Sequence, residues 1–478
     1  MCGVSSLWRL DKEVGGALIP NSMQRVAKCK LVGFCGAAAR RRGGQNITPS
    51  IQKVFDCKWY YFCSRLRGWL SLPAVGRRAF LAILVATLGY FVDVYDLILF
   101  SVLRQASLSD LGYGPKEIED YGILLINLQM VGMLVGGLLW GVLGDKRGRL
   151  SVLFGSIITY SVANILNGLV GSVYGYAIWR FVAGVGLAGE LGAGITLVSE
   201  LMPAQSRGWG TTLIATVGIL GAVAASLVGD LFPWRTAYFI GGGMGLVLLL
   251  LRVGVGESML FQALLEKPNL RMGDFGLIFQ SRERFWRYVW PILAGVPIWY
   301  VVGILVTFSP ELFAGRVEGT VRAGQSILYA YIGLAVGDLV AGVLSQVWRS
   351  RIRPVLLWLS IGGTLAILYN ILPLSRPEAV YAFDVGLGFF SGYWAVLLTG
   401  AAEQFGTNIR ATVATSIPNW IRGSLVLSTL LWEAFKDGLG LAGHHAALLT
   451  GLIVYSVALL SARRLRETYG ASLDFVET

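Results

Sequence analysis

Apolar residues along this chain fall into runs of membrane-spanning length from Arg78 onwards. Each run is ~20 residues long, which is the length that an α-helix needs to cross the hydrocarbon core of a bilayer. The connections between the runs are short, except for the charged segment 256–286. The pattern predicts twelve transmembrane helices, at residues 79–103, 121–143, 150–170, 176–199, 208–229, 235–255, 287–309, 325–347, 354–373, 378–401, 411–433 and 441–462.

The charged segment divides the predicted helices into two sets of six, so we expect two six-helix halves joined by a linker. The expected divisions are a basic, disordered tail at 1–57, an amphipathic interfacial segment at 58–78, a first half at 79–255, the linker at 256–286, a second half at 287–468 and a C-terminal tail at 469–478.

The two halves share sequence features in the same order. Residues 136–143 read Gly-Gly-Leu-Leu-Trp-Gly-Val-Leu, and residues 337–344, which lie 201 positions later, read Gly-Asp-Leu-Val-Ala-Gly-Val-Leu. A basic turn follows both stretches. The charged residues that match in order are Glu200 with Glu403, Arg207 with Arg410, and Glu257 with Glu467. The sequence therefore predicts an internal duplication of six helices.

Composition agrees with this membrane architecture. Apolar residues make up 55% of the chain, charged residues make up 14%, and 62 residues are glycine, which lets transmembrane helices pack closely. The formal charge of +12 comes mainly from residues 1–78, which hold 14 Lys and Arg against 3 Asp and Glu. The helical body is therefore nearly neutral, and we expect no nucleic-acid partner. All five cysteines lie within residues 1–78, at no spacing typical of a metal site.

The N-terminal tail allows more than one interpretation. Arg40, Arg41 and Arg42, with few acids around them, indicate a basic arm that faces the membrane surface. Residues 58–72 combine aromatic and basic side chains, which is typical of an interfacial amphipathic helix. The alternatives are a targeting peptide, because the tail is rich in arginine and poor in acids, or a reading frame that starts too early.

Basic residues in the predicted loops indicate the orientation in the membrane. The bases that collect on one side are Lys146, Arg147, Arg149, Arg207, Arg282, Arg284, Arg287, Arg349, Arg351, Arg353, Arg410, Arg463, Arg464 and Arg466. The loops on the opposite side are poorer in bases. Because basic loops stay in the cytoplasm, we expect both termini and the linker to be cytoplasmic.

A tight basic turn follows the second predicted helix, and its two glycines let two helix ends approach closely. Gly141, Asp145, Gly148 and Arg149 fit the pattern G-x-x-x-D-x-x-G-R. The turn resembles the signature loop between helices 2 and 3 of the major facilitator superfamily. The resemblance implies the fold of that family: an all-α membrane protein with twelve transmembrane helices in two six-helix pseudo-repeats, and a substrate site between the halves.

Other stretches are similar to the sugar-porter and metabolite:proton symporter branches of that family. These stretches are the acidic part of the first helix at 90–96, residues 180–190 and 200–208, and residues 402–410 in the second half. Two features depart from the family pattern. The second basic turn has Gln346 where the family has Asp, and the segment after the sixth helix reads Gly256-Glu257-Ser258 in place of Pro-Glu-Ser.

The resemblance also implies a conformational latch of charged residues at the cytoplasmic ends of the helices. The residues expected to form it are Asp145, Arg149, Glu200 and Arg207 in the first half, and Glu403 and Arg410 in the second half. Contacts of this kind bias a two-state rocking equilibrium when they break and form again. The alternative is a static surface network that contributes little to stability.

Three acids inside the predicted helices are candidates for proton coupling: Asp93, Glu190 and Asp96. A charge in the bilayer costs ~2.5 kcal/mol or more, so such a residue is a functional candidate by default. Asp93 and Asp96 are one helical turn apart and share a face. A buried carboxylate that binds and releases a proton meets the requirement of proton-driven transport. The alternative is a permanent buried ion pair that holds helices together.

Arg422, in the eleventh predicted helix, is the main candidate for substrate binding. A guanidinium at mid-depth binds a carboxylate or phosphate in a bidentate manner. It follows Pro418, and a proline inside a helix frees backbone carbonyls and permits a hinge. The other candidates for the pocket lining are Asn419, Trp299, Tyr300, Tyr393 and Trp394. The alternative for Arg422 is a structural ion pair with Asp338 or another acid.

The sequence thus predicts a proton-coupled transporter of a small organic solute, with an anion such as a carboxylate favoured by Arg422. The alternatives are an efflux antiporter of drugs or metabolites and a non-transporting nutrient sensor on the same fold. We expect no enzymatic activity, no cofactor and no metal site. The expected partners are the solute, protons and the lipid bilayer. We expect a multi-pass monomer in the cell membrane, which is the inner membrane if the source is a Gram-negative bacterium.

Overall fold

The computed structural model describes residues 77–192, 194–195, 207–251, 274–471 and 475–477. These residues form helices and connecting turns, with no strand among them. The long helices are α4 (Arg77–Asp110), α5 (Pro115–Arg147), α6 (Arg149–Asn167), α7 (Val173–Leu187), α9 (Arg207–Leu231), α10 (Trp234–Leu251), α12 (Arg282–Tyr300), α14 (Ala323–Trp348), α15 (Ile352–Ile371), α16 (Pro377–Ser391), α17 (Trp394–Ala402), α18 (Arg410–Glu433) and α19 (Gly443–Ala462). The short elements are η2 (Phe275–Ile278), η3 (Val301–Val306), α13 (Ser309–Leu312) and η4 (Ala434–Gly438).

Each of the twelve ranges predicted from the apolar runs contains helix among its described residues. Within the described residues, nine segments are long and apolar enough to cross a membrane. The predicted ranges outside these nine are those of α6, α7 and α18. Helix α18 carries Arg410, Asn419 and Arg422, which lower its hydropathy, yet all three side chains are buried. The count of twelve crossings and the cytoplasmic location of the termini stay predictions.

One predicted helix is interrupted in the structure. The range 378–401 holds two helices, because α16 ends at Ser391 and α17 begins at Trp394. Residue Gly392 lies at the break and packs against the backbone of Gly337 and Asp338 in α14, where a side chain would overlap with those atoms. The interruption thus coincides with a close helix–helix contact, and the apolar pattern of residues 378–401 reveals neither.

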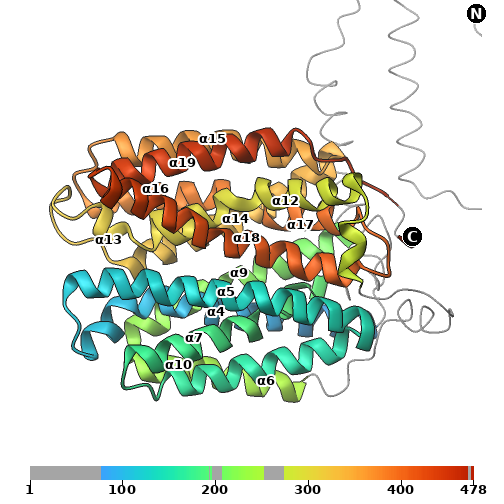
Figure 1. Ribbon diagram of the computed structural model, residues 1–478, viewed down its shortest axis with the longest axis horizontal. Coiled ribbons are helices and arrows are strands. Elements are labelled where there is room, and N and C mark those ends of the chain that lie inside the picture. The colour runs from blue at the N-terminus through green and yellow to red at the C-terminus, as the bar shows by residue number, and fades with distance from the viewer. Residues whose placement is uncertain (1–76, 193, 196–206, 252–273, 472–474, 478) are drawn as a thin grey trace, which may run out of the picture. The chain divides into compact units, whose positions relative to one another are not determined.

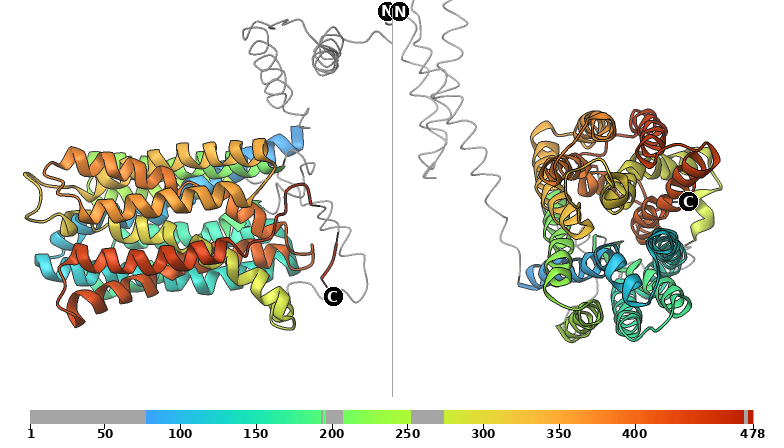
Figure 2. Two further views of the ribbon diagram at one scale, coloured as in Figure 1. Left: turned by 90° about the horizontal axis from the view of Figure 1, so that it is seen from above. Right: turned by 90° about the vertical axis from the view of Figure 1, so that its left-hand side faces the viewer.

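The helices form two groups (Figures 1 and 2). In the first group α4, α5, α6, α7, α9 and α10 pack on one another, and in the second group α12 and α14 to α19 do so. The most extensive packing between the groups is in two helix pairs: α5 packs along α18, and α9 packs along α14. In the predicted repeat α5 corresponds to α14, and α9 corresponds to α18. The contact of α5 with α18 is therefore the counterpart of the contact of α14 with α9. The packing is thus what an internal duplication requires. The proposed domain boundaries stay a prediction.

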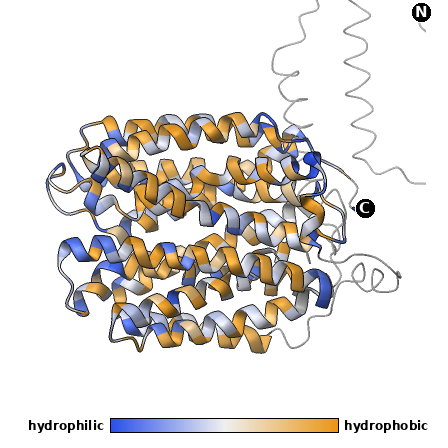
Figure 3. Ribbon diagram, in the orientation of Figure 1, coloured by the Kyte–Doolittle hydropathy of each residue, from blue (hydrophilic) through white to orange (hydrophobic). Residues whose placement is uncertain are grey.

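The surface of the helices is apolar along most of their length (Figure 3). Large hydrophobic side chains point outward, and Leu250, Leu427 and Leu460 are 72%, 71% and 64% exposed. Hydrophilic residues gather toward the two ends of the bundle (Figure 3). An apolar belt between two polar ends fits a protein whose helices are surrounded by lipid. The surface of the described helices is therefore typical of membrane-embedded helices.

Candidate functional site

Arg422 and Asp93 form an ion pair between the two helix groups. Nη2 of Arg422 in α18 lies 3.6 Å from Oδ2 of Asp93 in α4, and the two side chains are 1% and 0% exposed. A buried pair of this kind is costly to assemble, because both charges leave water. A purely stabilising role therefore explains this ion pair poorly. The alternative is that Arg422 and Asp93 exchange partners during function.

Asn419 fixes the position of Arg422 within α18. Its Oδ1 accepts a hydrogen bond from Nη1 of Arg422 at 3.3 Å. Its Nδ2 donates to the carbonyl oxygens of Ala188 at 2.8 Å and Thr415 at 2.7 Å. Since Ala188 directly follows α7, Asn419 also ties the second helix group to the first. Asn419 therefore holds the guanidinium of Arg422, the main candidate for substrate binding, in position.

A cavity of about 30 Å³ lies beside the guanidinium of Arg422. It is large enough for about one water molecule. Its lining residues are Tyr90, Val94, Leu97, Ile219, Ile298, Trp299, Val302, Tyr331, Leu334, Trp394 and Arg422. They come from both helix groups, so the cavity lies between the groups, as the family resemblance predicts. A cavity this small fits a state that is closed around its binding site.

Apart from Arg422, the side chains with polar atoms in this lining are all aromatic. The ring centroid of Trp394 lies 5.8 Å from Cζ of Arg422. Nε1 of Trp394 donates a hydrogen bond to the hydroxyl of Tyr90 at 3.1 Å. Sequence reasoning found Trp299 and Trp394 but missed Tyr90 and Tyr331. Tyrosine is common at membrane interfaces, so its presence in a predicted helix carries no signal for a cavity.

Two of the aromatic candidates lie elsewhere. The hydroxyl of Tyr300 donates to the carbonyl oxygen of Ala447 in α19 at 2.7 Å. The hydroxyl of Tyr393 donates to the carbonyl oxygen of Ala294 in α12 at 2.9 Å. Both side chains are buried within the second helix group, and neither lines the cavity beside Arg422. Their hydroxyl groups join helices of one group, and a contact of these two side chains with substrate stays a prediction.

The other two acid candidates are also buried. Asp96 is 0% exposed and lies against Gly241 of α10, within the first helix group. Glu190 is 1% exposed and follows the end of α7. The ion pair with Arg422 is formed by Asp93. This contact places Asp93 directly against the candidate anion-binding group, and all three acids stay candidates for proton coupling.

Asp145 connects the end of α5 to the beginning of α18. Its carboxylate accepts hydrogen bonds from the backbone N–H groups of Ala411 at 3.2 Å and Thr412 at 2.8 Å, and from the Thr412 hydroxyl at 2.6 Å. A helix N-terminus carries unpaired N–H groups and a partial positive charge, so a carboxylate is stabilised there. The predicted latch residue thus contacts the second helix group, whereas its expected role within the first half stays a prediction. The side chains of Arg149 and Arg207, and all of Glu200, lie outside the described residues.

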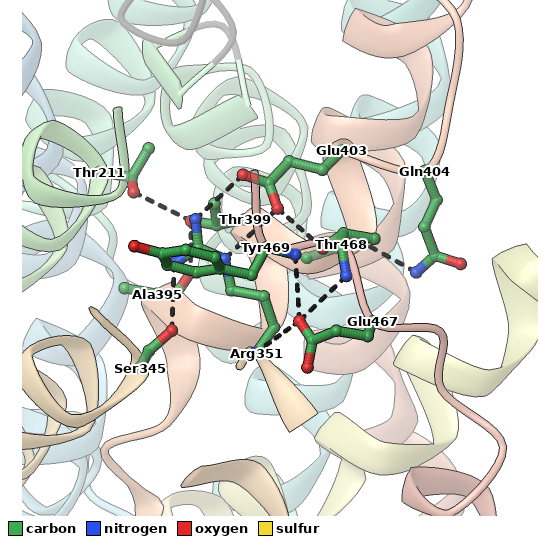
Figure 4. A network of polar contacts seen from close by, with 11 residues as sticks. Thr211, Ser345, Arg351, Ala395, Thr399, Glu403, Gln404, Glu467, Thr468 and Tyr469 are labelled. Carbon is green, nitrogen blue, oxygen red and sulfur yellow. Dashed lines mark hydrogen bonds and ion pairs between the residues drawn. The ribbon is translucent and has the colours of Figure 1, made fainter. Parts of the chain in front are cut away.

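Glu403 belongs to a polar network at the same end of the second group (Figure 4). Its carboxylate pairs with the guanidinium of Arg351 at 3.0 Å and accepts a hydrogen bond from the Thr468 hydroxyl at 2.8 Å. Nε of Arg410, the expected partner, donates to the carbonyl oxygen of Phe405 at 3.3 Å. Arg351 was recognised in the sequence only as a basic loop residue. Its spacing from Glu403 gave no indication of the pair.

Glu467 extends this network around the beginning of α15 (Figure 4). Its carboxylate accepts hydrogen bonds from the Ser350 hydroxyl at 2.5 Å and from the backbone N–H groups of Arg351 at 2.8 Å and Tyr469 at 3.0 Å. Burial alone would raise the pKa of Glu467, but these hydrogen bonds outweigh it and lower the pKa below its ordinary value. Glu467 is therefore held in its ionised form.

The opposite end of the bundle is also joined across the groups. Nη2 of Arg104 in α4 lies 2.6 Å from Oε1 of Glu311 in α13. Nζ of Lys436 in η4 lies 2.6 Å from Oε1 of Glu119 in α5. Sequence analysis identified none of these four residues as a latch. With Asp145 connecting the other end, the two helix groups contact each other through polar side chains on both sides of the central cavity.

Comparisons with known proteins agree with this geometry. The profile described as Major Facilitator Superfamily matches residues 79–423. The putative niacin/nicotinamide transporter NiaP of Bacillus subtilis is 25% identical over 389 residues, which cover 79% of this chain and 92% of that protein. The 3-(3-hydroxy-phenyl)propionate transporter of Escherichia coli is 28% identical over 349 residues, which cover 70% of this chain and 84% of that protein. Among solved structures, the proton:xylose symporter XylE matches with a TM-score of 0.64 at 17% identity, covering 84% of this chain and 98% of that chain.

Proposed function

The chain belongs to the major facilitator superfamily and is a multi-pass membrane transporter, and from this premise we propose that it moves a small organic anion with protons by alternating access. The observation that carries the proposal is the buried ion pair of Arg422 and Asp93 between the two helix groups. The pair combines a guanidinium, which binds anions, with a carboxylate, which binds protons. It lies where the two helix groups meet.

The proposed solute is a carboxylate with an aromatic or otherwise flat, apolar body. Arg422 supplies two parallel donors to a carboxylate. The rings of Trp299, Trp394 and Tyr90 line the adjacent cavity and supply flat apolar surfaces. The relative from Escherichia coli is named for a substrate of this type, an aromatic ring joined to a propionate. The relative's name supports the solute class, and the lining residues give the physical reason for it.

The proton enters the mechanism through Asp93. While the site is empty, the guanidinium of Arg422 and the carboxylate of Asp93 neutralise each other. When a substrate carboxylate binds Arg422, the carboxylate of Asp93 loses its partner and faces a second anion in a buried site. A proton bound to Asp93 removes that repulsion. Substrate and proton therefore favour each other's binding by the same coupling free energy.

Alternating access follows from the contacts at the two ends of the bundle. Asp145 joins the groups at one end, and the pairs Arg104–Glu311 and Lys436–Glu119 join them at the other. Opening one end breaks its contacts while those at the other end hold the groups together. The cavity beside Arg422 would thus face one side of the membrane at a time.

Uptake into proteoliposomes tests the proposal. Purified protein would be reconstituted into vesicles and offered labelled aromatic carboxylates. Uptake would be measured with a pH gradient that is acidic outside and neutral inside, and without a gradient. We expect accumulation that requires the gradient, together with gradient-independent counterflow. Accumulation driven only by the opposite gradient would indicate an efflux antiporter. Binding without any transport would indicate a sensor. Transport of neutral solutes in preference to carboxylates would contradict the role of Arg422.

A further inference from the structure

A basic cavity lies at the end of the bundle where α12 begins and α19 ends. Its volume is about 390 Å³. Its lining residues are Arg282, Glu283, Trp286, Arg287, Trp290, Pro291, Gln404, Arg464, Leu465 and Arg466. Four arginines and one glutamate give this lining a strong positive charge. The transport mechanism proposed above makes no use of the cavity.

Two of the four arginines are neutralised within the protein. Arg287 pairs with Glu477 at 3.1 Å, and Arg466 pairs with Glu283 at 2.8 Å. The side chains of Arg282 and Arg464 are exposed. In the part of the chain that the structure describes, neither of them has an ion-pair partner. The cavity therefore presents two guanidinium groups that are available to an anion from outside.

A second, apolar cavity lies further along α12, between that helix and α5, α18 and α19. Its volume is about 460 Å³. Its lining residues are Val131, Leu134, Ile292, Leu293, Val296, Trp420, Gly423, Ser424, Val426, Leu427, Ser428, Leu431, Ile453, Val454 and Val457. Serine hydroxyls are the only polar side-chain groups in this lining apart from the indole N–H of Trp420. Helix α12 thus contributes to the basic cavity with its first residues and to the apolar cavity with those that follow.

Helical spacing places both cavities along one seam. Trp286, Trp290 and Leu293 are four and three residues apart, so they lie on one face of α12. Ile453 and Val457 continue with Leu460 at the same spacing along α19, and all three are exposed. The rise from Arg282 to Leu293 is about 16 Å for an α-helix. This length is comparable to the distance from a lipid phosphate into the upper half of its acyl chains.

Trp286 and Trp290 line the basic cavity and precede Ile292 and Leu293 of the apolar cavity along α12. The rings of Trp286 and Trp290 stack with their centroids 4.4 Å apart and an angle of 16° between their planes. Tryptophan favours the depth at which lipid headgroups meet acyl chains, because its ring is apolar and its N–H is polar. The seam therefore runs from charged, through amphipathic, to apolar residues, in the order in which a phospholipid changes from phosphate to acyl chain.

We propose that this seam binds one anionic glycerophospholipid, with its phosphate between Arg282 and Arg464 and an acyl chain in the apolar cavity. Charge complementarity selects an anionic lipid, since the two guanidinium groups repel the ammonium group of a zwitterionic headgroup. A free phosphate satisfies the basic cavity but leaves the apolar cavity without an occupant. The protein contributes fixed charges at a membrane surface, where each basic residue adds about 1 kcal/mol to the attraction for anionic lipid.

Lipid retention measured by native mass spectrometry tests this site. The full chain would be exchanged into an equimolar mixture of phosphatidylglycerol and phosphatidylcholine with identical acyl chains. We expect wild type to retain one phosphatidylglycerol in clear preference. The double variant Arg282→Gln/Arg464→Gln should lose that preference by about thirtyfold, as two contacts of about 1 kcal/mol each predict. Arg353→Gln, which changes an exposed arginine at the same end of the bundle but outside both cavities, should retain it.

Two further arms separate this lipid site from other anion sites. Inorganic phosphate, added at millimolar concentration, should not displace the lipid. Ile453→Trp fills part of the apolar cavity and should weaken retention of phosphatidylglycerol while leaving both arginines in place. Equal retention of the two lipids by wild type would overturn the proposal, and so would loss of preference in Arg353→Gln. Displacement by phosphate alone would show a site for soluble anions instead. Matching thermal unfolding of all variants in detergent checks that each one is folded.

Discussion

Oδ1 of Asp338 accepts a hydrogen bond from the backbone N–H of Ala395 at 2.9 Å, so a buried acid of α14 caps the first turn of α17. The capped turn begins at Trp394, whose ring lies beside Arg422 in the central cavity. The break between α16 and α17 at Gly392 packs on the same part of α14. Asp338 thus fixes the position of an aromatic side chain in the proposed site without lining the cavity itself.

Asp338→Ala should weaken substrate binding. The variant removes the acceptor for the Ala395 N–H, and loss of a cap costs about 1 kcal/mol. Displacement of Trp394 would then reduce substrate affinity by about five- to tenfold. Asp338→Asn retains an acceptor oxygen and should bind nearly as well as wild type. Isothermal titration of purified protein with substrate would measure this. Equal affinities for wild type and the alanine variant would contradict the positioning role.

Asp93→Asn should separate transport from proton coupling. The variant removes the group that binds the proton and also neutralises the partner of Arg422. We therefore expect it to lose accumulation against a gradient while retaining exchange of labelled for unlabelled solute. Uptake and counterflow in the same proteoliposomes would be compared. Glu190→Gln and Asp96→Asn are the matched control variants, because each neutralises another buried acid. If Asp93→Asn still concentrates solute, coupling lies elsewhere.

Arg422→Lys should reduce affinity for the anionic solute more than it disturbs folding. Lysine keeps the positive charge opposite Asp93 but loses the planar pair of donors. Loss of one charge-assisted hydrogen bond of about 1.5–3 kcal/mol predicts an affinity at least tenfold lower. Binding would be measured by titration and folding by thermal unfolding. An unchanged affinity would assign Arg422 a structural role in the ion pair alone.

Asp145→Asn should slow the conformational cycle. The carboxylate accepts three hydrogen bonds from the first turn of α18, and an asparagine replaces an ionised acceptor by a neutral one. We expect a folded protein with normal substrate affinity but a transport rate reduced by tenfold or more. Initial rates of uptake at saturating substrate would show this. A wild-type rate would rule out the latch.

Glu467→Gln should lower stability at neutral pH. The hydrogen bonds to Glu467 lower its pKa, so the stability that they add is complete above the ordinary pKa of glutamate and is lost as pH falls through the lower folded value. We expect a loss of about 1 kcal/mol after allowing for solvent screening. Thermal unfolding of both proteins from about pH 7 to about pH 3.5 would test this. The difference between them should shrink at the acidic end, and a constant difference would contradict the ionised role.

Local sequence was sufficient for part of the proposed site. Arg422 and Asp93 were conspicuous because a charge within an apolar run is costly, so it attracts attention without any knowledge of its surroundings. Trp299 and Trp394 followed from their distance to the ends of the predicted helices. The same argument also selected Tyr300 and Tyr393, which lie within the second helix group. Tyr90 and Tyr331 were missed, since a cavity depends on how neighbouring helices are rotated.

The sequence by itself determined where the helices lie, how they divide into two related sets, and which family they resemble. These properties depend on apolar content, period and short motifs, which the chain carries locally. Only the tertiary structure decided which charges meet: Asp93 with Arg422, Arg351 with Glu403, and Asp145 with the first turn of α18. Such pairs join residues from helices far apart in the chain. Their distances are set by the tilt and rotation of packed helices, and those result from close contacts summed over whole interfaces rather than from any local pattern.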